Sequence, residues 1–458
     1  MSGSSSSSSS IALLTPYDGG NLGDAAIQDA LIANLRALDA NVQLYGITLN
    51  PVRTSARHHI PCFPLAVISR PYYQPAPAAA FAPSSSGQVR ARAKPNFVQR
   101  IKRKLLTITP FRQLRALLRE VGHIARSYRF LRQVNVLAVA GGGQLDEEWG
   151  GAWGHPYALF KWTTLARLAG ASVVVLSVGA CQIEGRLTRL FLRRALSLAT
   201  YRSYRDEGSK QLALAITPLA EGPVVPDIAF SLPVGQYKPV PSASAFPLRI
   251  AFSPISYGHP GLWPTPNAPH YERYITELAA FASFLLQSGA SIVLFSSSSP
   301  DELIFAELRK RLDSRLRQED RARILTSEAS SHGELLALFQ SVDYVVSSRL
   351  HALLLSFLVH KPAIAISYDR KVTCLMEEMG QAAYCFDIKS VTSDNLREAF
   401  SEIQTNRQHI SSKLSLVQRG YNSALRSQYQ VVRGMFSCES GLIEGNIDGP
   451  AVCDVDAK

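Results

Sequence analysis

The sequence predicts an α/β protein built from two doubly wound domains, each with a parallel sheet covered by helices. Apolar strand-like runs alternate with helix-like segments along most of the 458 residues, which is the pattern of parallel α/β folds. A proline-rich stretch at 234–247 divides this alternation into two halves. Residues 343–370 read as strand, polar turn, helix and strand, which is one βαβ unit of a parallel sheet.

The first domain is expected at 11–233, after a disordered serine-rich tail at 1–10. It begins with a strand, a glycine-rich turn and a helix that carries Ile27, Leu31, Leu35 and Leu38 on one face. A second strand follows near 42–49, and the Pro-, Ala- and Ser-rich residues 51–90 are expected to form a long loop. Later strands are expected in the segments VNVLAVA, SVVVLSV and YRSY, with helices between them.

The second domain is expected at 248–386. Its strands are predicted in the segments LRIAFS, SIVLFSS, RARILT, YVVS and AIAIS, again separated by helices. Helices at 387–437 are expected to pack back onto the domains, and 438–458 to form a loose tail. Two Rossmann-like domains of this kind face each other across a cleft, which is the GT-B-like arrangement.

The positive charge of the chain is concentrated in one segment. The formal net charge is +12, and residues 88–133 contain 13 Lys or Arg but a single acid, Glu120. We expect a basic helical insertion there. Three interpretations stay open: a solvated helix pair, a segment that docks on an anionic membrane surface, or a nucleic-acid site. No nucleic-acid-binding motif accompanies the charge, so no nucleic-acid partner is expected.

The cysteines and the apolar segments bear on the compartment. The six cysteines include no C-x-x-C pair and indicate neither a disulfide framework nor a zinc site. We expect no metal, no signal peptide and no membrane-spanning helix. A cytoplasmic location follows, with peripheral attachment to the inner face of the plasma membrane if the basic segment binds lipid.

The strongest candidate site lies in the βαβ unit at 343–370. Arg349 and His351 lie at the mouth of its helix, after the N-cap-type residue Ser348. A helix N-terminus favours an anion, and an arginine with a titratable histidine suits a carboxylate or phosphate. In the structural alternative, Arg349 pairs with an acid and His351 is an ordinary helix histidine.

Glycine-rich turns supply further candidates. Asn21 and Asp24 follow the first strand, where they either cap the helix or contact a sugar. Their turn lacks the G-x-G-x-x-G spacing of dinucleotide sites. Gly142 and Gly143 follow another strand, ahead of a loop whose carboxylates and aromatic residues, together with His155, either bind a sugar or form a structural loop.

Four short segments together resemble the polysaccharide pyruvyl transferase family. They are Ser-Ser-Arg-Leu-His at 347–351, which is similar to the family's Ser-x-Arg-Leu-His, Gly-Asn-Leu-Gly-Asp at 20–24, Arg-Asp-Glu-Gly-Ser at 205–209 and Tyr-Asp at 368–369, followed by Lys371-Val372. Arg370 stands where the family commonly has proline. The turn at Gly179 keeps one glycine of a Gly-x-Gly, and the strand ending at Ser253 lacks an arginine that many members carry there.

The resemblance implies transfer of pyruvate from phosphoenolpyruvate to two hydroxyls of a sugar residue, with no cofactor beyond that donor. The acceptor would be a cell-surface polysaccharide or its lipid-linked precursor. His351 would act as the acid, Asp24 as the base, and Arg349 and Lys371 as anion ligands. Arg205 would bind the ligand or anchor Asp206. The remaining substrate-binding candidates are Asn21, Gly142, Gly143, His155 and Ser348.

Two other functions fit the same fold. One is a GT-B glycosyltransferase that uses a nucleotide sugar, and the other is a non-catalytic glycan-assembly protein. A nucleotide that binds the folded protein would raise its thermal stability, whereas phosphoenolpyruvate would do so only for a pyruvyl transferase.

Overall fold

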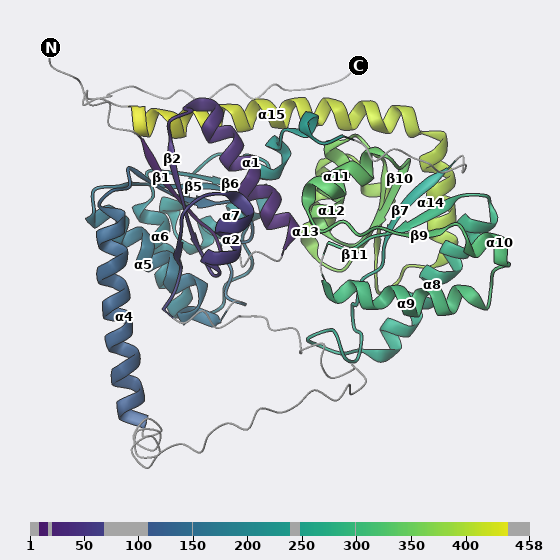
Figure 1. The fold of residues 1–458 in the computed structure, drawn as a ribbon, viewed down its shortest axis with the longest axis horizontal. Coiled ribbons are helices and arrows are strands. Elements are labelled where there is room, and N and C mark those ends of the chain that lie inside the picture. Colours follow the sequence, from purple (N-terminus) through teal and green to yellow (C-terminus); the bar gives the residue numbers. More distant parts are fainter. Residues whose placement is uncertain are drawn as a thin grey trace.

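The computed structural model describes residues 9–16, 21–67, 109–148, 150–238, 248–297 and 299–437. These residues contain two six-stranded sheets, ordered β3-β2-β1-β4-β5-β6 and β12-β11-β10-β7-β8-β9, in which the paired strands are parallel (Figure 1). Counted within each sheet, both follow the 3-2-1-4-5-6 order of the Rossmann fold. The predicted fold class is confirmed.

The first sheet has strands β1 Ser10–Leu14, β2 Gln43–Thr48, β3 Cys62–Pro64, β4 Val136–Ala140, β5 Ser172–Val178 and β6 Tyr201–Tyr204. Its helices are α1 Leu22–Leu38, α2 Pro51–His58, α4 Thr109–Leu131, α5 His155–Leu168, α6 Arg186–Leu198 and α7 Glu207–Ile216. Strands β1 and β4 are buried along their whole length, because helices cover both faces of a parallel sheet.

The second sheet has strands β7 Arg249–Ser253, β8 Ser291–Leu294, β9 Ile324–Thr326, β10 Tyr344–Ser347, β11 Ala363–Ser367 and β12 Cys385–Asp387. Its helices are α8 Ala268–Gln287, α9 Ser299–Asp313, α10 Gln318–Arg321, α11 His332–Gln340, α12 Leu350–Leu358 and α13 Arg370–Glu378. In Figure 1, α11, α12 and α13 lie between this sheet and the first domain.

Helix α12 shows why the second domain faces the first. Every residue from Ala352 to Leu358 is buried, so the helix is covered on all sides and not only on one apolar face. One side packs on β10 and β11, and another contacts the short 3-10 helix η4, Ile228–Ser231, of the first domain. The N-terminus of α12 is thereby held at the boundary between the two domains.

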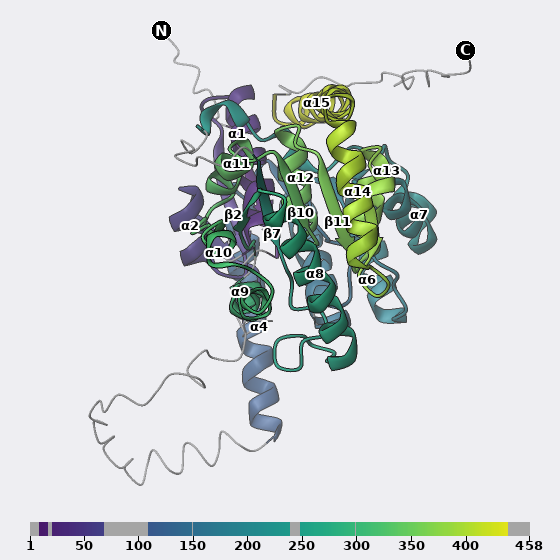
Figure 2. The ribbon, with the colours of Figure 1, turned by 90° about the vertical axis from the view of Figure 1, so that its right-hand side faces the viewer.

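Two helices follow the second sheet, α14 Ser393–Thr405 and α15 Arg407–Ser437. Helix α15 runs along both domains (Figure 1) and is seen end-on in Figure 2. On the second domain its Gln418 hydrogen-bonds His360. On the first domain the Nε2 of Gln428 donates to the Ser177 hydroxyl at 3.1 Å, and the hydroxyls of Tyr429 and Ser231 are 2.7 Å apart. The helix therefore ties the two domains together.

The prediction of a long loop at 51–90 is wrong for the first part of that range, which contains α2 and β3. Pro51 occupies the first turn of α2, and the Asn50 side chain accepts a hydrogen bond from the Arg53 amide at 3.2 Å. This helix is short and polar, so it has no apolar periodicity to reveal it. Residues 68–90 lie outside the described residues.

The remaining predictions about organisation are tested only in part. The basic segment contributes one described helix, α4, and residues 88–108 lie outside the described residues, as do the tails at 1–8 and 438–458 and residues 239–247 of the predicted linker. The domain boundaries therefore stay predictions. In the part of the chain that the structure describes, no helix is long and apolar enough to cross a membrane.

Candidate functional site

The N-termini of α1 and α12 meet between the two domains. A Cβ atom added to Gly23 would lie 2.0 Å from Nδ1 of His351, so the imidazole packs directly on the first turn of α1. The Nε2 atom of His351 is buried and has no hydrogen-bond partner among the described residues. Glycine at position 23 thus lets a histidine from the second domain reach the opening turn of the first.

Asn21 and Asp24 lie at the same helix N-terminus. The exposed Asn21 caps α1, since its Oδ1 accepts a hydrogen bond from the Gly23 amide at 2.9 Å. Asp24 is half-buried, and its Oδ1 lies 3.7 Å from the position of a Cβ on Gly142. The cap predicted as the structural alternative is therefore present at Asn21, and Asp24 faces the glycine-rich turn after β4.

The turn after β4 requires glycine. Gly141 and Gly142 have φ angles of 47° and 68°, a left-handed conformation that costs other residues energy. A Cβ on Gly141 would also approach Ile27 to 2.8 Å. The next residue, Gly143, lies against the second domain, since its Cβ position is 4.0 Å from Nζ of Lys371.

Lys371 extends from α13 toward the loops of the first domain. Its amide donates to Oδ1 of Asp369 at 2.9 Å. Burial favours the neutral amine, but Cys181, Asp369 and Asp146 outweigh it, so the pKa of Lys371 is raised and the side chain is a cation. The thiol of Cys181 also donates to Asp146 at 3.5 Å. Lys371 is therefore a positive charge from the second domain placed among first-domain loops.

Arg205 is held by acids, as its structural alternative proposed. Its guanidinium lies 3.4 Å from Asp227 and 3.6 Å from Asp206, and the side chain is 11% exposed. A Cβ on Gly179 would come within 2.8 Å of the guanidinium, so the single glycine kept in that turn makes room for it. Ligand binding by Arg205 stays a prediction.

Arg349 also has an acidic partner, as its structural alternative proposed. Its Nε and Nη2 lie 2.8 and 2.7 Å from Oδ2 of the fully buried Asp301, and its Nη1 donates to the Tyr368 hydroxyl at 3.3 Å. A buried carboxylate needs such a partner. The side chain keeps 22% of its surface exposed, and contact between that part and a substrate stays a prediction.

His155 and Ser348 are buried, and substrate binding by either side chain stays a prediction. His155 is 4% exposed, and its Nε2 lies 2.8 Å from the Gln144 side-chain oxygen. Burial lowers the pKa of His155 to about 4, which keeps the ring neutral. Ser348 is fully buried. Both side chains lie in the packed interior, which sequence position alone did not reveal.

An aromatic cluster beside Arg349 was missed as a group in the sequence. The rings of Tyr257 and Trp263 are 5.2 Å apart, and those of Trp263 and Tyr368 are 5.5 Å apart. The Arg349 guanidinium lies 6.0 Å from the centre of the Tyr368 ring. Tyr368 is more than 100 positions away from Trp263 in the chain, so nothing local in the sequence links the two.

A small cavity lies between the domains. The first domain lines it with Arg205, Asp206, Asp227 and Phe230, and the second with Leu350, Leu354, Lys371, Cys374, Leu375 and Glu378. Its volume of about 20 Å³ holds roughly one water molecule. A substrate of the size of phosphoenolpyruvate does not fit this cavity unless the domains move apart.

Glu378 is a further titratable group at this cavity that the sequence did not indicate. Burial raises the pKa of Glu378 to about 7, and the carboxylates Asp206 and Asp227 act in the same direction. The Tyr421 hydroxyl of α15 donates to Glu378 at 3.2 Å. The neighbours that set its pKa come from the first domain and from α15, so they are visible only in the folded chain.

Within the described ranges, no three His, Cys, Asp or Glu side chains are grouped as ligands for a metal ion. The cations near the site are instead Lys371, Arg205 and Arg349. Together with the N-termini of α1 and α12, these charges suit an anionic substrate.

Residues 21–370 match the family model of the polysaccharide pyruvyl transferases. The chain belongs to the polysaccharide pyruvyl transferase family. Membership implies an enzyme of polysaccharide biosynthesis. The matched range includes α1, the glycine-rich turn after β4, Arg205 and the N-terminus of α12. No match was found among curated protein sequences.

Solved structures with the same fold include proteins bound to UDP or to a nucleotide sugar. The Anabaena protein HepE, in complex with UDP, is 14% identical, with a TM-score of 0.52 over 94% of this chain and 100% of its own. UDP-GlcNAc 2-epimerase from Neisseria meningitidis, bound to UDP-GlcNAc, is 11% identical, with a TM-score of 0.54 over 93% and 100%. At these identities the similarity shows the GT-B-like fold alone.

Proposed function

We propose that this protein transfers pyruvate from phosphoenolpyruvate to two hydroxyls of one sugar residue, forming a ketal and releasing phosphate. The acceptor is a sugar of a cell-surface polysaccharide or of its lipid-linked precursor. Family membership supports the reaction class. The observation that carries the site is the contact of His351 with Gly23 at the meeting point of two helix N-termini.

Phosphoenolpyruvate carries a carboxylate and a phosphate, and the site offers positive charge for both. Lys371 is the cation nearest the glycine-rich turn. The amides that open α1 and α12 add donors for an anion. Arg349, although paired with Asp301, turns Nη1 toward Tyr368, and we assign it a supporting contact with the donor.

The chemistry needs one proton donor and one proton acceptor. His351 protonates the methylene carbon, which becomes a methyl group, while the first hydroxyl forms a bond to the central carbon. The second hydroxyl then displaces phosphate at the same carbon and closes the ketal. Over the cycle, the proton of the first hydroxyl restores the proton that His351 gave away, and the proton of the second hydroxyl leaves with phosphate. Asp24, which lies beside Gly142, accepts the proton of the first hydroxyl.

The acceptor side of the site would use Asn21, which is exposed, together with the aromatic cluster of Tyr257, Trp263 and Tyr368. Gly142 and Gly143 let the sugar approach the backbone closely. Because the cavity between the domains holds about one water molecule, we propose that the domains separate to admit substrates and close for the reaction. We place this reaction in the cytoplasm, where phosphoenolpyruvate is available.

The reaction is tested by phosphate release from phosphoenolpyruvate in the presence of candidate acceptor glycans, with mass spectrometry of the glycan. His351→Ala should slow turnover by about 10²–10⁴-fold with little change in donor affinity, as expected when an acid catalyst is lost. His409, which is exposed on α15, provides the control His409→Ala. Wild-type turnover in His351→Ala would refute the assignment of the acid.

The two alternatives are separated by thermal shift. Phosphoenolpyruvate should raise the melting temperature of the protein, because a ligand that binds only the folded state stabilises it. A shift with nucleotide sugars and none with phosphoenolpyruvate would favour a glycosyltransferase. Binding of glycan without phosphate release would favour a non-catalytic assembly protein.

A further inference from the structure

Helix α4 presents an exposed apolar stripe. Every residue from Gln113 to Arg119 is exposed. The large apolar side chains of this half are 52–63% exposed and recur at i, i+3, i+4 and i+7: Leu114, Leu117, Leu118 and Val121. This spacing puts them on one side of the helix. An apolar stripe of this kind on the surface of a soluble domain marks an interaction site.

The C-terminal half of α4 is firmly docked, so the helix is a fixed part of the fold. Lys161 of α5 donates to Glu120 at 2.8 Å, and Tyr157 donates to the same carboxylate at 3.1 Å. The ring of His123 lies 3.0 Å from the Pro64 carbonyl oxygen, and His123 is buried. The exposed half therefore extends from a rigid anchor (Figure 1).

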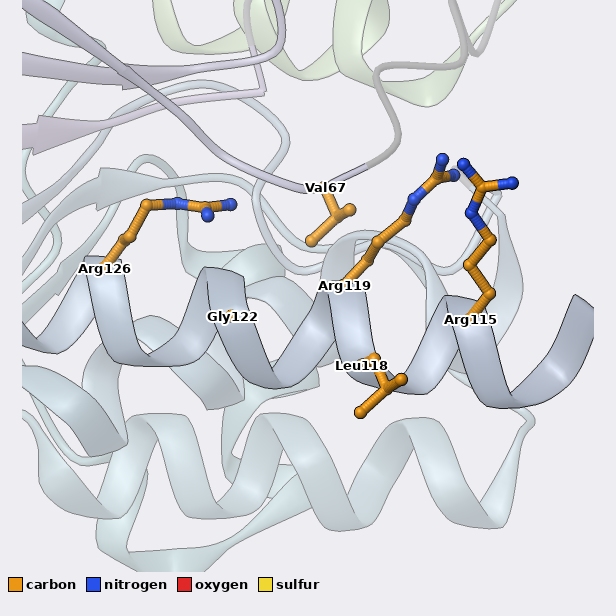
Figure 3. Close-up of a pocket in the computed structure, with 6 residues that line it drawn as sticks. All are labelled: Val67, Arg115, Leu118, Arg119, Gly122 and Arg126. Carbon is orange, nitrogen blue, oxygen red and sulfur yellow. The ribbon is translucent and has the colours of Figure 1, made fainter.

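Arginines border the stripe. Arg115, Arg119 and Arg126 project from one side of the helix beside Val67, while Leu118 projects from the other side (Figure 3). They line a groove of about 510 Å³ together with Leu118 and Gly122. The only acid between positions 113 and 133 is Glu120, and Lys161 and Tyr157 already engage it. The exposed part of α4 therefore combines apolar and basic side chains.

An exposed tryptophan packs on Tyr157, a neighbour of α4. Trp153 is 68% exposed, and its ring lies 5.5 Å from the ring of Tyr157, the residue that hydrogen-bonds Glu120. Tryptophan is enriched where proteins meet the headgroup region of a bilayer. The sequence left two roles open for the loop that contains Trp153, sugar binding or a structural loop. Its packing against Tyr157 and Phe191 favours a surface role instead.

We propose that the α4 surface, defined as Leu114, Leu117, Leu118 and Val121 with Arg115, Arg119 and Arg126, docks on an anionic membrane surface. Leucines enter the boundary between headgroups and acyl chains, and the arginines bind lipid phosphates. A nucleic acid would use the arginines but not the aliphatic stripe. A second copy of this surface would bring like charges together.

The position of α4 gives the docking a consequence. A crossover helix runs antiparallel to the strands that it connects, so the exposed N-terminal half lies toward the carboxyl edge of the first sheet. That is the edge at which the glycine-rich turn and Lys371 meet. Docking would bring this edge close to the bilayer and to any acceptor carried by a lipid. The docking itself does not depend on the proposed reaction.

The test is sedimentation of the full chain with vesicles. Vesicles of equal parts phosphatidylglycerol and phosphatidylcholine should retain the protein at low salt, whereas vesicles of phosphatidylcholine alone should retain much less. Arg115→Gln with Arg119→Gln should lower the partition by about 25-fold, from the contribution of each basic side chain near an anionic surface. Leu117→Ser with Leu118→Ser should lower it by about tenfold or more.

Matched controls come from α15, where Leu416 is 62% exposed and Arg433 is exposed. Leu416→Ser and Arg433→Gln should sediment like wild type. Circular dichroism would confirm that all variants are folded. Recovery of wild-type protein in the supernatant with anionic vesicles would overturn the proposal. So would unchanged binding of the leucine double variant, or a fluorescent duplex oligonucleotide that binds in an arginine-dependent way and outcompetes the vesicles.

Discussion

At the scale of single residues, the candidate site depends on how closely a few side chains approach one another. His351 occupies the space that a Cβ on Gly23 would fill, so a glycine in one domain positions a histidine of the other. Charges near this contact are compensated in different ways. Arg349 and Arg205 have carboxylates at hydrogen-bond or ion-pair distance, whereas Lys371 has Asp369 only at 4.0 Å.

The contact between Gly23 and His351 yields the first prediction. Gly23→Ala should reduce turnover by about 10²-fold or more, because the ring must leave its position and an acid catalyst then loses its alignment. Gly235→Ala is the control, since a Cβ there meets nothing within 4 Å. Phosphate release is the measurement. Equal turnover in Gly23→Ala and wild type would show that the position of His351 does not matter.

The second prediction concerns acid stability and His155. Its pKa is about 4 in the folded protein, against an ordinary 6.5. Between these pH values the unfolded chain binds more protons than the folded one, so stability falls as pH falls through this window. The loss amounts to about 3 kcal/mol.

The comparison protein is His155→Gln, which replaces the imidazole next to Gln144 by a side-chain amide that can still donate a hydrogen bond and does not titrate. Urea unfolding at pH 7, 6, 5 and 4 should show a smaller loss of stability on acidification for the variant. The raised pKa of Glu378 acts with the opposite sign, since the folded state binds the extra proton between 4.5 and about 7. Because wild type and His155→Gln both contain Glu378, its contribution cancels when their losses of stability are compared. Parallel pH profiles would contradict the prediction.

At the scale of elements, short polar helices and long amphipathic ones differ in what their sequences reveal. Helix α12 was predicted from its apolar periodicity, and α2 was missed because a capped polar helix of 8 residues resembles a loop in composition. Helix α15 has 31 residues and contains two glycines, Gly420 and Gly434, whose Cβ positions meet nothing within 4 Å.

The third prediction follows from that open space. Gly434→Ala should raise the free energy of unfolding by about 0.5–1 kcal/mol, because alanine favours the helix and loses less backbone entropy. Gly380→Ala provides the contrast. Gly380 has a φ of 64°, and a Cβ there would lie 2.4 Å from Lys413, so that variant should lose stability. Denaturant unfolding measures the free energy of unfolding of both variants. A loss of stability in Gly434→Ala would contradict the prediction.

At the scale of the whole molecule, α15 controls how the two domains sit together. Gln428 of this helix donates to Ser177 and accepts a hydrogen bond from Ser203 in the interior of the first domain. Both serines are fully buried. The same helix contacts His360 and Glu378 of the second domain, so a change in α15 affects both.

The fourth prediction tests this connection. Gln428→Ala leaves the buried hydroxyls of Ser177 and Ser203 without their amide partner, which should cost about 1–3 kcal/mol of stability. The exposed Gln430 of the same helix provides the control Gln430→Ala, which should change stability little. Urea unfolding measures both. A Gln428→Ala variant as stable as wild type would show that α15 does not depend on this contact for docking.

The sequence by itself determined the two-domain α/β fold and the positions of the glycine-rich turns and helix N-termini. These are local properties, because strand and helix periodicity and the conformational freedom of glycine depend on neighbouring residues. It also located Arg349, His351, Lys371 and Asp24 near the carboxyl edges of strands, where parallel α/β proteins bind their ligands.

Only the tertiary structure decided which of these side chains are compensated, buried or brought together. Arg349 meets Asp301 across 48 positions, His155 is enclosed beside Gln144, and Glu378 gains its raised pKa beside Asp206 and Asp227. The physical reason is that desolvation and Coulomb interactions depend on distances in space. Those distances are set by packing between segments that are far apart in the chain.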